Sequence, residues 1–201
     1  MKALIVVDIQ KDFLPGGALG VAGGDEIVAV VNRLMEGFPL VVATQDWHPP
    51  DHGSFAVNNP GKSEYGMGEL GGLPQVMWPV HCVEGSEGAE FADGLDVGKI
   101  AKIFPKGTSA VVDSYSGFFD NDGKHSTGLA EWLRGAGVTD VTVCGLALDY
   151  CVKFTALDAV KEGFSTSLHL SACRGVNLVP GDVEKAVAGM RAAGVGIVEG
   201  C

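Results

Sequence analysis

No stretch of the sequence approaches the roughly 20 consecutive apolar residues that a membrane-spanning helix needs. Basic residues are also few, because 14 Lys and Arg stand against 25 Asp and Glu and give a formal net charge of −11 at pH 7. This balance disfavours nucleic acids and anionic membrane surfaces as partners. It is compatible with a neutral or cationic small molecule as the ligand.

Cysteine is scarce, and no CxxC spacing is present. The apolar stretch over residues 3–7 is too short for a secretory signal and is followed by a charge at Asp8. We therefore expect reduced thiols and a cytoplasmic location. The five cysteines are Cys82, Cys144, Cys151, Cys173 and Cys201.

Short β-branched runs alternate with helical patterns, which predicts one α/β domain over residues 1–201 with a doubly wound, mainly parallel sheet. A length of 201 residues and a hydrophobic content of 46% suit one well-buried core. Residues 45–98 are rich in Pro, Gly, His and Asn, and we expect them to fold as loops over the carboxyl edge of the sheet. The predicted strands are 3–7, 40–44, 99–104, 141–144, 164–170 and 195–199, and the predicted helices are 25–36, 129–135, 150–161 and 180–190.

Cys151 lies where an apolar strand pattern stops and a helical pattern begins. The N-terminus of a helix offers free N–H groups and the positive end of the helix dipole, which predicts a lowered pKa for the Cys151 thiol. A thiolate is the nucleophilic form of cysteine. The alternative is a buried cysteine that packs as a small apolar residue.

Two further polar residues follow predicted strands, where the ligands of open α/β sheets bind. Asp8 follows the first strand and Lys106 the third. A carboxylate can accept the proton of a thiol, and an ammonium can balance the charges of both groups, so Asp8, Lys106 and Cys151 suit acyl transfer from an amide. In isolation, Asp8 is equally compatible with a turn former and Lys106 with a solvated side chain.

A second group of polar residues predicts a metal site. Asp46 and His48 face the same way in an extended segment, and His81 can add a further ligand. Carboxylate and imidazole suit Zn, Fe or Mn without choosing among them. The alternative is that these histidines only form hydrogen bonds within loops. His125 and His169 lack such neighbours.

Six motifs in order along the chain resemble those of nicotinamidases (pyrazinamidases), within the isochorismatase-like cysteine hydrolases. They cover nearly the whole sequence. The histidine cluster and the Trp-Pro-x-His-Cys motif distinguish this group from the wider superfamily. The motifs are VDIQKDF at 7–13, QDWHP at 45–49, WPVHC at 78–82, FPKG at 104–107, DSYSGF at 113–118 and GLALDYCV at 145–152.

The resemblance implies a three-layer α/β/α fold, the isochorismatase-like hydrolase fold, with a six-stranded parallel sheet in the order 3-2-1-4-5-6. It implies hydrolysis of nicotinamide, and of pyrazinamide, to the acid and ammonia in NAD salvage through a thioester. Asp8, Lys106 and Cys151 match the family triad. One divalent metal, Zn or Fe/Mn, is implied, and no nucleotide cofactor. A homo-oligomer is among the assembly states that the sequence leaves open.

The resemblance also assigns the remaining site residues. Asp46, His48 and His81 match metal ligands, and His52 matches a ligand found in some members only. The metal would bind the pyridine nitrogen. The N–H groups of Ala147 and Cys151 match an oxyanion hole, after a cis peptide between Leu146 and Ala147. Residues expected to line the ring pocket are Phe13, Trp78, Tyr115, Leu146 and Tyr150, the last at a position where relatives often have His.

Three other functions are compatible with parts of the sequence. An amidase acting on another small amide or ureido substrate remains an alternative, although such relatives generally lack the metal motifs. A member that binds ligand without catalysis is disfavoured by the intact triad residues. A dinucleotide-binding dehydrogenase is disfavoured because no GxGxxG turn follows the first strand, where Asp8 stands instead.

Overall fold

Six parallel strands form the central sheet of the protein, whose computed structural model describes residues 1–200. Their order across the sheet is β5-β2-β1-β6-β7-β8, and every neighbouring pair is parallel. The predicted order 3-2-1-4-5-6 is therefore confirmed. The strands are β1 (Lys2–Val7), β2 (Val41–Asp46), β5 (Lys102–Lys106), β6 (Asp140–Gly145), β7 (Ser165–Cys173) and β8 (Gly196–Val198).

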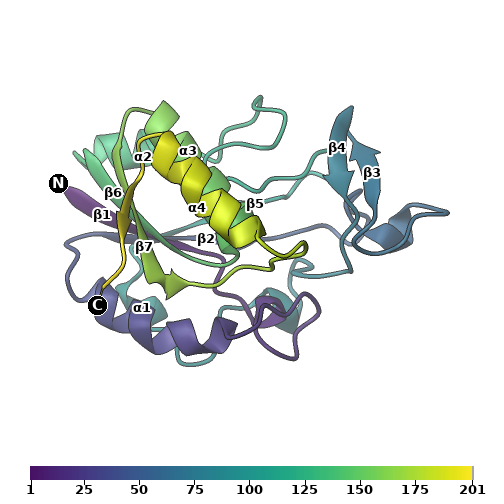
Figure 1. The fold of residues 1–201 in the computed structure, drawn as a ribbon, viewed down its shortest axis with the longest axis horizontal. Coiled ribbons are helices and arrows are strands. Elements are labelled where there is room, and N and C mark those ends of the chain that lie inside the picture. Colours follow the sequence, from purple (N-terminus) through teal and green to yellow (C-terminus); the bar gives the residue numbers. More distant parts are fainter. Residues whose placement is uncertain (201) are drawn as a thin grey trace.

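Helices cover both faces of the sheet and complete the predicted three layers. Figure 1 shows α1 on one side and α2, α3 and α4 on the other. The side of α1 that meets the sheet carries Ile27, Val31 and Met35 at helical spacing, and all three are buried. In the described part of the chain no helix is long and apolar enough to cross a membrane. The helices are α1 (Ile27–Met35), α2 (Leu129–Gly135), α3 (Lys153–Lys161) and α4 (Asp182–Ala192).

The strand β1 lies in the middle of the hydrophobic core. Residues 3–7 have no exposed surface, because strands flank β1 on both edges and helices cover both faces. A continuous apolar run is what such a position requires. Asp8, which directly follows β1, therefore lies at the carboxyl edge of the sheet and is fully buried.

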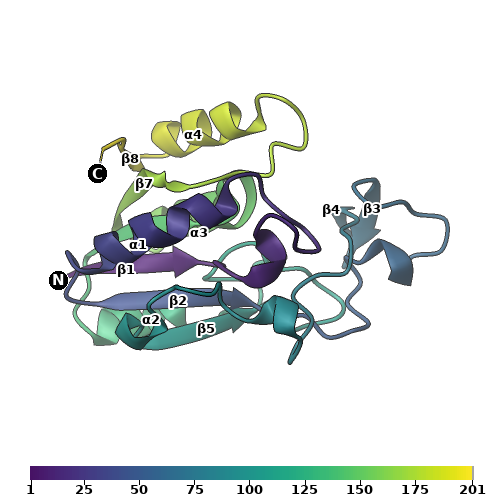
Figure 2. The same ribbon diagram turned by 90° about the horizontal axis from the view of Figure 1, so that it is seen from below.

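The predicted loop region over residues 45–98 contains regular structure that the prediction missed. An antiparallel hairpin forms from β3 (Met67–Leu70) and β4 (Leu73–Val76). Its turn is Gly71-Gly72, with φ angles of +60° and +80° that favour glycine and suit a two-residue hairpin turn. Figure 2 shows β1, β2 and β5 pointing toward this hairpin, so the region lies beyond the carboxyl ends of the strands, as predicted.

Several boundaries differ from the predicted ones in ways that affect the site. The second strand continues to Asp46 and the third includes Lys106, so both residues are strand ends and pair across β2 and β5. The helix predicted from residue 150 is preceded by a π-helical turn, Leu148–Val152, which joins β6 to α3. Cys201 lies outside the described residues, whereas the other four cysteines are buried free thiols, as expected.

Candidate active site

The carboxyl ends of the strands bring the three predicted triad residues together. Asp8 follows β1, Lys106 ends β5, and Cys151 lies in the π-helical turn after β6. Nζ of Lys106 is 2.9 Å from Oδ2 of Asp8 and 3.4 Å from Sγ of Cys151. The structure therefore brings these three side chains together, and their catalytic roles stay a prediction.

Lys106 is a buried ammonium with several partners. Beyond Asp8 and Cys151, its Nζ donates to Oδ1 of Asp46 at 2.5 Å and to the carbonyl of Ser114 at 2.9 Å. Burial alone would lower the pKa of Lys106, but the charges of Asp46, Asp8 and Cys151 outweigh it and raise the pKa well above its ordinary value. Lys106 is therefore charged and balances the surrounding acids.

Asp8 is a fully buried carboxylate held from two sides. Its Oδ1 accepts a hydrogen bond from Oγ1 of Thr44 at 2.6 Å, and its Oδ2 faces Lys106. Burial raises the pKa of Asp8 to about 6; Lys106 opposes this shift and Asp46 adds to it. Near neutral pH Asp8 is thus mostly ionised but ready to accept a proton, as a general base should be.

The predicted lowering of the Cys151 pKa is wrong. Burial raises the pKa of the Cys151 thiol well above its usual value, and the carboxylates of Asp8 and Asp46 add to the rise, while Lys106 opposes it. The prediction considered only the helix dipole, whereas loss of solvent around the sulfur dominates. The resting group is a thiol, so it needs a base beside it.

The segment before Cys151 has the features expected of an oxyanion hole. The peptide between Leu146 and Ala147 is cis, as the resemblance implies. Within residues 1–200 the backbone N–H of Ala147 donates no hydrogen bond. Ala147 and Cys151 line the same pocket. An N–H without an acceptor at a pocket wall can donate to an oxygen that develops negative charge there.

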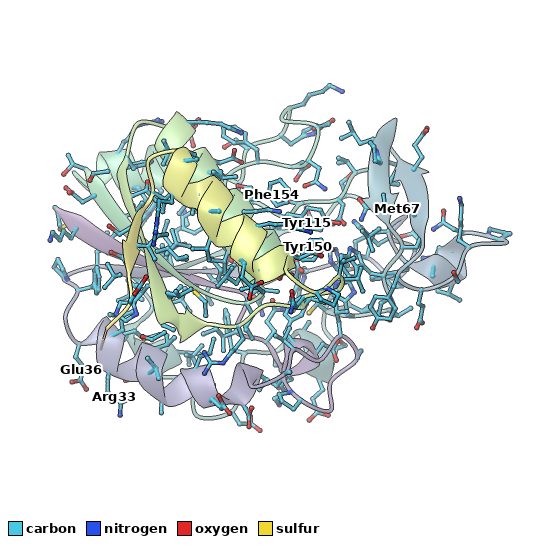
Figure 3. All side chains as sticks on the ribbon, viewed as in Figure 1. Arg33, Glu36, Met67, Tyr115, Tyr150 and Phe154 are labelled. Carbon is cyan, nitrogen blue, oxygen red and sulfur yellow. The ribbon has the colours of Figure 1, made fainter. Side chains whose placement is uncertain are left out.

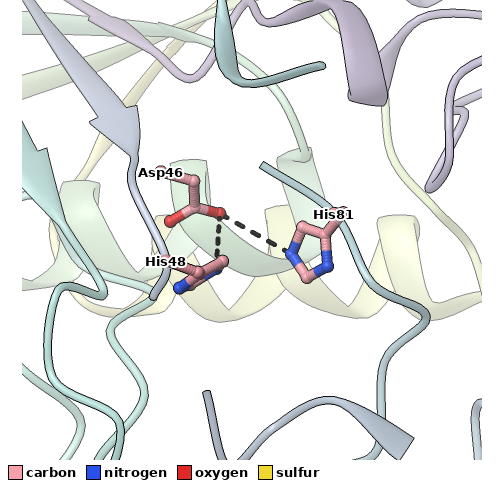
Figure 4. A group of neighbouring side chains, drawn as sticks. All are labelled: Asp46, His48 and His81. Atoms are coloured by element: carbon pink, nitrogen blue, oxygen red, sulfur yellow. Dashed lines mark ion pairs between the residues drawn. The ribbon is translucent and has the colours of Figure 1, made fainter. Parts of the chain in front are cut away.

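The predicted metal ligands gather around Asp46, which Lys106 also contacts. Oδ2 of Asp46 lies 3.6 Å from Nε2 of His48 and 4.0 Å from Nε2 of His81 (Figure 4). The Nδ1 atoms of the two rings contact the carbonyls of Gly107 and Pro79, both at 2.8 Å. These contacts orient each ring with Nε2 toward Asp46, the arrangement that metal-binding histidines commonly show.

Asp46 and His81 have charge states that fit a divalent cation, whereas the charge of Asp46 outweighs burial and raises the pKa of His48. Burial and the neighbouring His48 lower the pKa of His81 to about 4, so its ring is neutral at pH 7 and can act as a ligand. Burial would raise the pKa of Asp46, but Lys106 and His48 hold it well below its usual range. Gln10 fixes Asp46 by accepting from its N–H and donating to its carbonyl, both at 2.8 Å.

His52 lies beside this cluster. The centroid of its ring lies 4.2 Å from that of His48, with the two planes tilted by 37°, and its Nε2 is buried without a hydrogen-bond partner in the described residues. His48, His52 and Asp113 form a second group whose ligand atoms lie within 4.8 Å of one another. The orphaned Nε2 supports metal binding here, although His52 belongs to a group different from that of Asp46 and His81.

Aromatic side chains wall the pocket that contains these groups. Trp78 meets Tyr150 edge-on at 5.0 Å, and Tyr115 meets Tyr150 at 5.5 Å. Figure 3 shows Tyr115 and Tyr150 lying together, with Phe154 next to Tyr115. Leu146 does not line this pocket: it is fully buried in the core, so its predicted contact with the ring is not supported. The lining comprises Phe13, Leu19, Asp46, His48, Trp78, His81, Asp113, Tyr115, Ala147, Tyr150, Cys151 and Val176.

Comparison with known proteins agrees with this geometry. The family model described as the Isochorismatase domain matches residues 2–199. The chain belongs to the isochorismatase family. A nicotinamidase from Escherichia coli (strain K12) is 48% identical over 197 residues, which are 96% of this chain and 92% of that protein. The family predicted from the six motifs is confirmed.

Solved structures of isochorismatase-like enzymes share the whole fold. A nicotinamidase and pyrazinamidase from Acinetobacter baumanii is similar with a TM-score of 0.96 and 44% identity over 98% of this chain and 95% of that one. A pyrazinamidase of Pyrococcus horikoshii, solved in complex with zinc, is similar with a TM-score of 0.82 and 41% identity over 99% of both chains.

Some residues of this family member's site were not predicted from its sequence. Leu19 and Val176 reach the pocket from loops, which carry no periodic signal. Asp113 was noted only as part of a motif, although its carboxylate accepts from Gln75 at 2.7 Å and lies near His52. Thr44 looked like an ordinary strand residue. Only the arrangement of the strands reveals its bond to Asp8.

Proposed function

We propose that this protein is a nicotinamidase, an amidohydrolase that converts nicotinamide to nicotinate and ammonia. The observation that carries the proposal is that one pocket is lined both by Cys151, which has Lys106 and Asp8 beside it, and by the Asp46, His48 and His81 cluster. The first group suits nucleophilic attack on a carboxamide. The second group suits a metal ion that could bind a ring nitrogen. The reaction would serve NAD salvage, with residues 1–201 acting as one catalytic domain.

The metal-ligand cluster and the aromatic side chains of the pocket would together bind the substrate. A divalent cation held by Asp46, His48 and His81, zinc or else iron or manganese, would supply a Lewis acid that fixes the pyridine nitrogen. Aromatic walls from Phe13, Trp78 and other rings would sandwich a flat heterocycle. Pyrazinamide has the same shape with one more ring nitrogen, so we propose it as a second substrate.

The first half of the reaction forms a thioester. Asp8 accepts the proton of the Cys151 thiol, and the sulfur attacks the carboxamide carbon. The N–H groups of Ala147 and Cys151 would bind the oxyanion of the tetrahedral intermediate. Asp8 then gives the proton to the departing nitrogen, which leaves as ammonia while the carbonyl reforms as a thioester. Lys106 keeps the buried charge balanced through each step.

The second half hydrolyses the acyl-enzyme. Asp8, again ionised, takes a proton from a water molecule that attacks the thioester carbonyl. The same N–H groups would hold the second oxyanion. Its collapse breaks the carbon–sulfur bond, releases nicotinate and restores the Cys151 thiol with the proton from Asp8. Atoms balance, because one water enters and one ammonia and one acid leave.

Ammonia release over a small panel of amides tests the proposal. We expect turnover of nicotinamide and pyrazinamide, little turnover of an N-carbamoyl compound, and loss of about 10³-fold or more in kcat for Cys151→Ala, as for other covalent nucleophiles. Cys144→Ala, which removes a buried thiol of the core, is the matched control and should keep kcat. Preference for the N-carbamoyl compound, or undiminished turnover by Cys151→Ala, would overturn the proposal.

A further inference from the structure

The carboxylate of Asp8 has a dedicated hydrogen-bond donor on the neighbouring strand. Oγ1 of Thr44, in β2, donates to Oδ1 of Asp8 at 2.6 Å. Neither residue has any exposed surface. A hydroxyl that donates to a carboxylate forms a short, charge-assisted bond, and water cannot replace it in this dry environment.

The two oxygens of Asp8 are not equivalent. Thr44 occupies Oδ1, whereas Oδ2 forms an ion pair with Nζ of Lys106 at 2.9 Å. The same Nζ also contacts Asp46, the Ser114 carbonyl and, at 3.4 Å, Sγ of Cys151. Asp8 and Cys151 offer atoms within 4.8 Å of each other. Because one ammonium contacts both Oδ2 and the sulfur, Oδ2 is the oxygen on the side of Asp8 that faces Lys106 and Cys151.

We propose that Thr44 is a positioning residue that holds Oδ1 of Asp8 and so keeps Oδ2 turned toward Lys106 and the Cys151 thiol, whose proton it takes. The inference rests on the proposed function, in which Asp8 is the base. In that step the S–H bond breaks, its electron pair stays on sulfur, and an O–H bond forms at Oδ2. If the carboxylate turned, Oδ2 would move away from Lys106, whose Nζ also contacts the Cys151 sulfur.

Threonine fits this role better than serine because packing against Gly117 restricts its methyl group. A Cβ on Gly117 would lie 2.6 Å from Cγ2 of Thr44, so the missing side chain of Gly117 makes room for that methyl. A β-branched side chain has few χ1 rotamers, and fixing the methyl also fixes the direction of the hydroxyl. Valine would keep the methyl group that packs against Gly117 but lose the hydroxyl donor. Serine would keep the hydroxyl donor but lose the methyl group.

Kinetics of Thr44→Val and Thr44→Ser, each with its metal content measured, test the inference. A hydrogen bond to a charged group predicts a loss of about 10- to 100-fold in kcat for Thr44→Val. KM should change less than twofold, because Thr44 does not line the pocket. The acid limb of kcat should move to higher pH, since the lost bond favours ionised Asp8. Thr44→Ser should recover most of kcat.

Thr166→Val is the matched control. Thr166 is also a buried strand threonine, and its hydroxyl donates to the carbonyl of Phe164 at 3.0 Å, far along β7 from the site. This variant should lose stability while keeping kcat and the acid limb. Should Thr44→Val fail to fold, Thr44→Ala against Thr44→Ser gives the same comparison of hydroxyl absent and present.

Two results would overturn the inference. One is a Thr44→Val enzyme with kcat within threefold of the parent and an unmoved acid limb. The other is a Thr44→Ser enzyme as impaired as Thr44→Val, because the hydroxyl would then not be the group that matters. The Asp8→Asn variant separates these failures from failure of the proposed function. If Asp8→Asn kept its activity, Asp8 would not be the base, and the proposed function would fail whatever the Thr44 variants do.

Discussion

Nζ of Lys106 lies 2.9 Å from Oδ2 of Asp8, and neither side chain is exposed to solvent. The ammonium also contacts Asp46, so one cation balances the base and a candidate metal ligand at once. This shared position couples the two halves of the site. Buried charges without such a partner are costly, and the fold accommodates Asp8 and Asp46 only while Lys106 is present.

Replacing Lys106 with Met should therefore affect both stability and catalysis. We expect the free energy of unfolding to fall by about 3–5 kcal/mol, because two buried carboxylates lose their counter-ion, and ammonia release to cease. Urea denaturation and the amide assay measure the two effects. Lys102→Met, an exposed change on the same strand, should alter neither by much. Equal stability of Lys106→Met and the parent would contradict this account of the charge balance.

The pH profile of kcat/KM should report the ionisation of Asp8. The base works only when deprotonated, and burial raises the pKa of Asp8 to about 6, so activity should be full above pH 7. Below pH 6 it should fall about tenfold for each further pH step, as one protonation requires. Metal content must be measured at each pH to separate this limb from metal loss. A profile flat down to pH 5 with metal retained would contradict a base whose pKa is raised by burial.

Metal binding should depend strongly on His81 and less on His52. Titration of metal-free protein with Zn²⁺, Fe²⁺ or Mn²⁺ should show near-complete loss of affinity in His81→Ala, because a direct ligand is removed. His52→Ala should weaken binding about tenfold, the lower end of what removing a supporting group costs. His125→Ala, an exposed change, is the control. Affinity of His52→Ala equal to that of the control would show that His52 takes no part.

Tyr150 should contribute through its ring. Its contacts in the pocket are the edge-on meetings with Trp78 and Tyr115. Tyr150→Phe should leave kcat and KM for nicotinamide within twofold, whereas Tyr150→Ala should raise KM about tenfold through lost aromatic packing. Measuring pyrazinamide alongside shows whether this residue sets the preference between the two amides. A large effect of Tyr150→Phe would instead assign the hydroxyl a role.

Much of the fold follows from local pattern. Runs such as residues 3–7 are apolar because β1 is buried on all sides. The order of the strands, in contrast, was expected from the family resemblance and not from local pattern. The hairpin of β3 and β4 was missed because its strands are short and one contains Pro74. The signal available was Gly71-Gly72 between two short runs, a two-residue hairpin turn.

The positions of site residues that follow strands could be predicted from the sequence. Their pKa values and long-range hydrogen bonds could not, because these depend on the folded surroundings. Asp8, Lys106 and Cys151 stand at strand ends, and parallel strands bring such ends together. The pKa of Cys151 was predicted in the wrong direction because a sequence shows the helix start but not how completely the fold removes water from the sulfur. The bond from Thr44 to Asp8 joins residues 36 positions apart, and no local pattern encodes it.

The claim on which the account depends is that the Cys151 sulfur carries the acyl group. Mass spectrometry of enzyme quenched in acid during turnover of nicotinamide tests it most directly. We predict a nicotinoyl thioester on the peptide that contains Cys151, absent without substrate and absent from Cys151→Ala. Steady-state turnover with the acyl group on another residue, or sustained ammonia release by Cys151→Ala, would contradict the account.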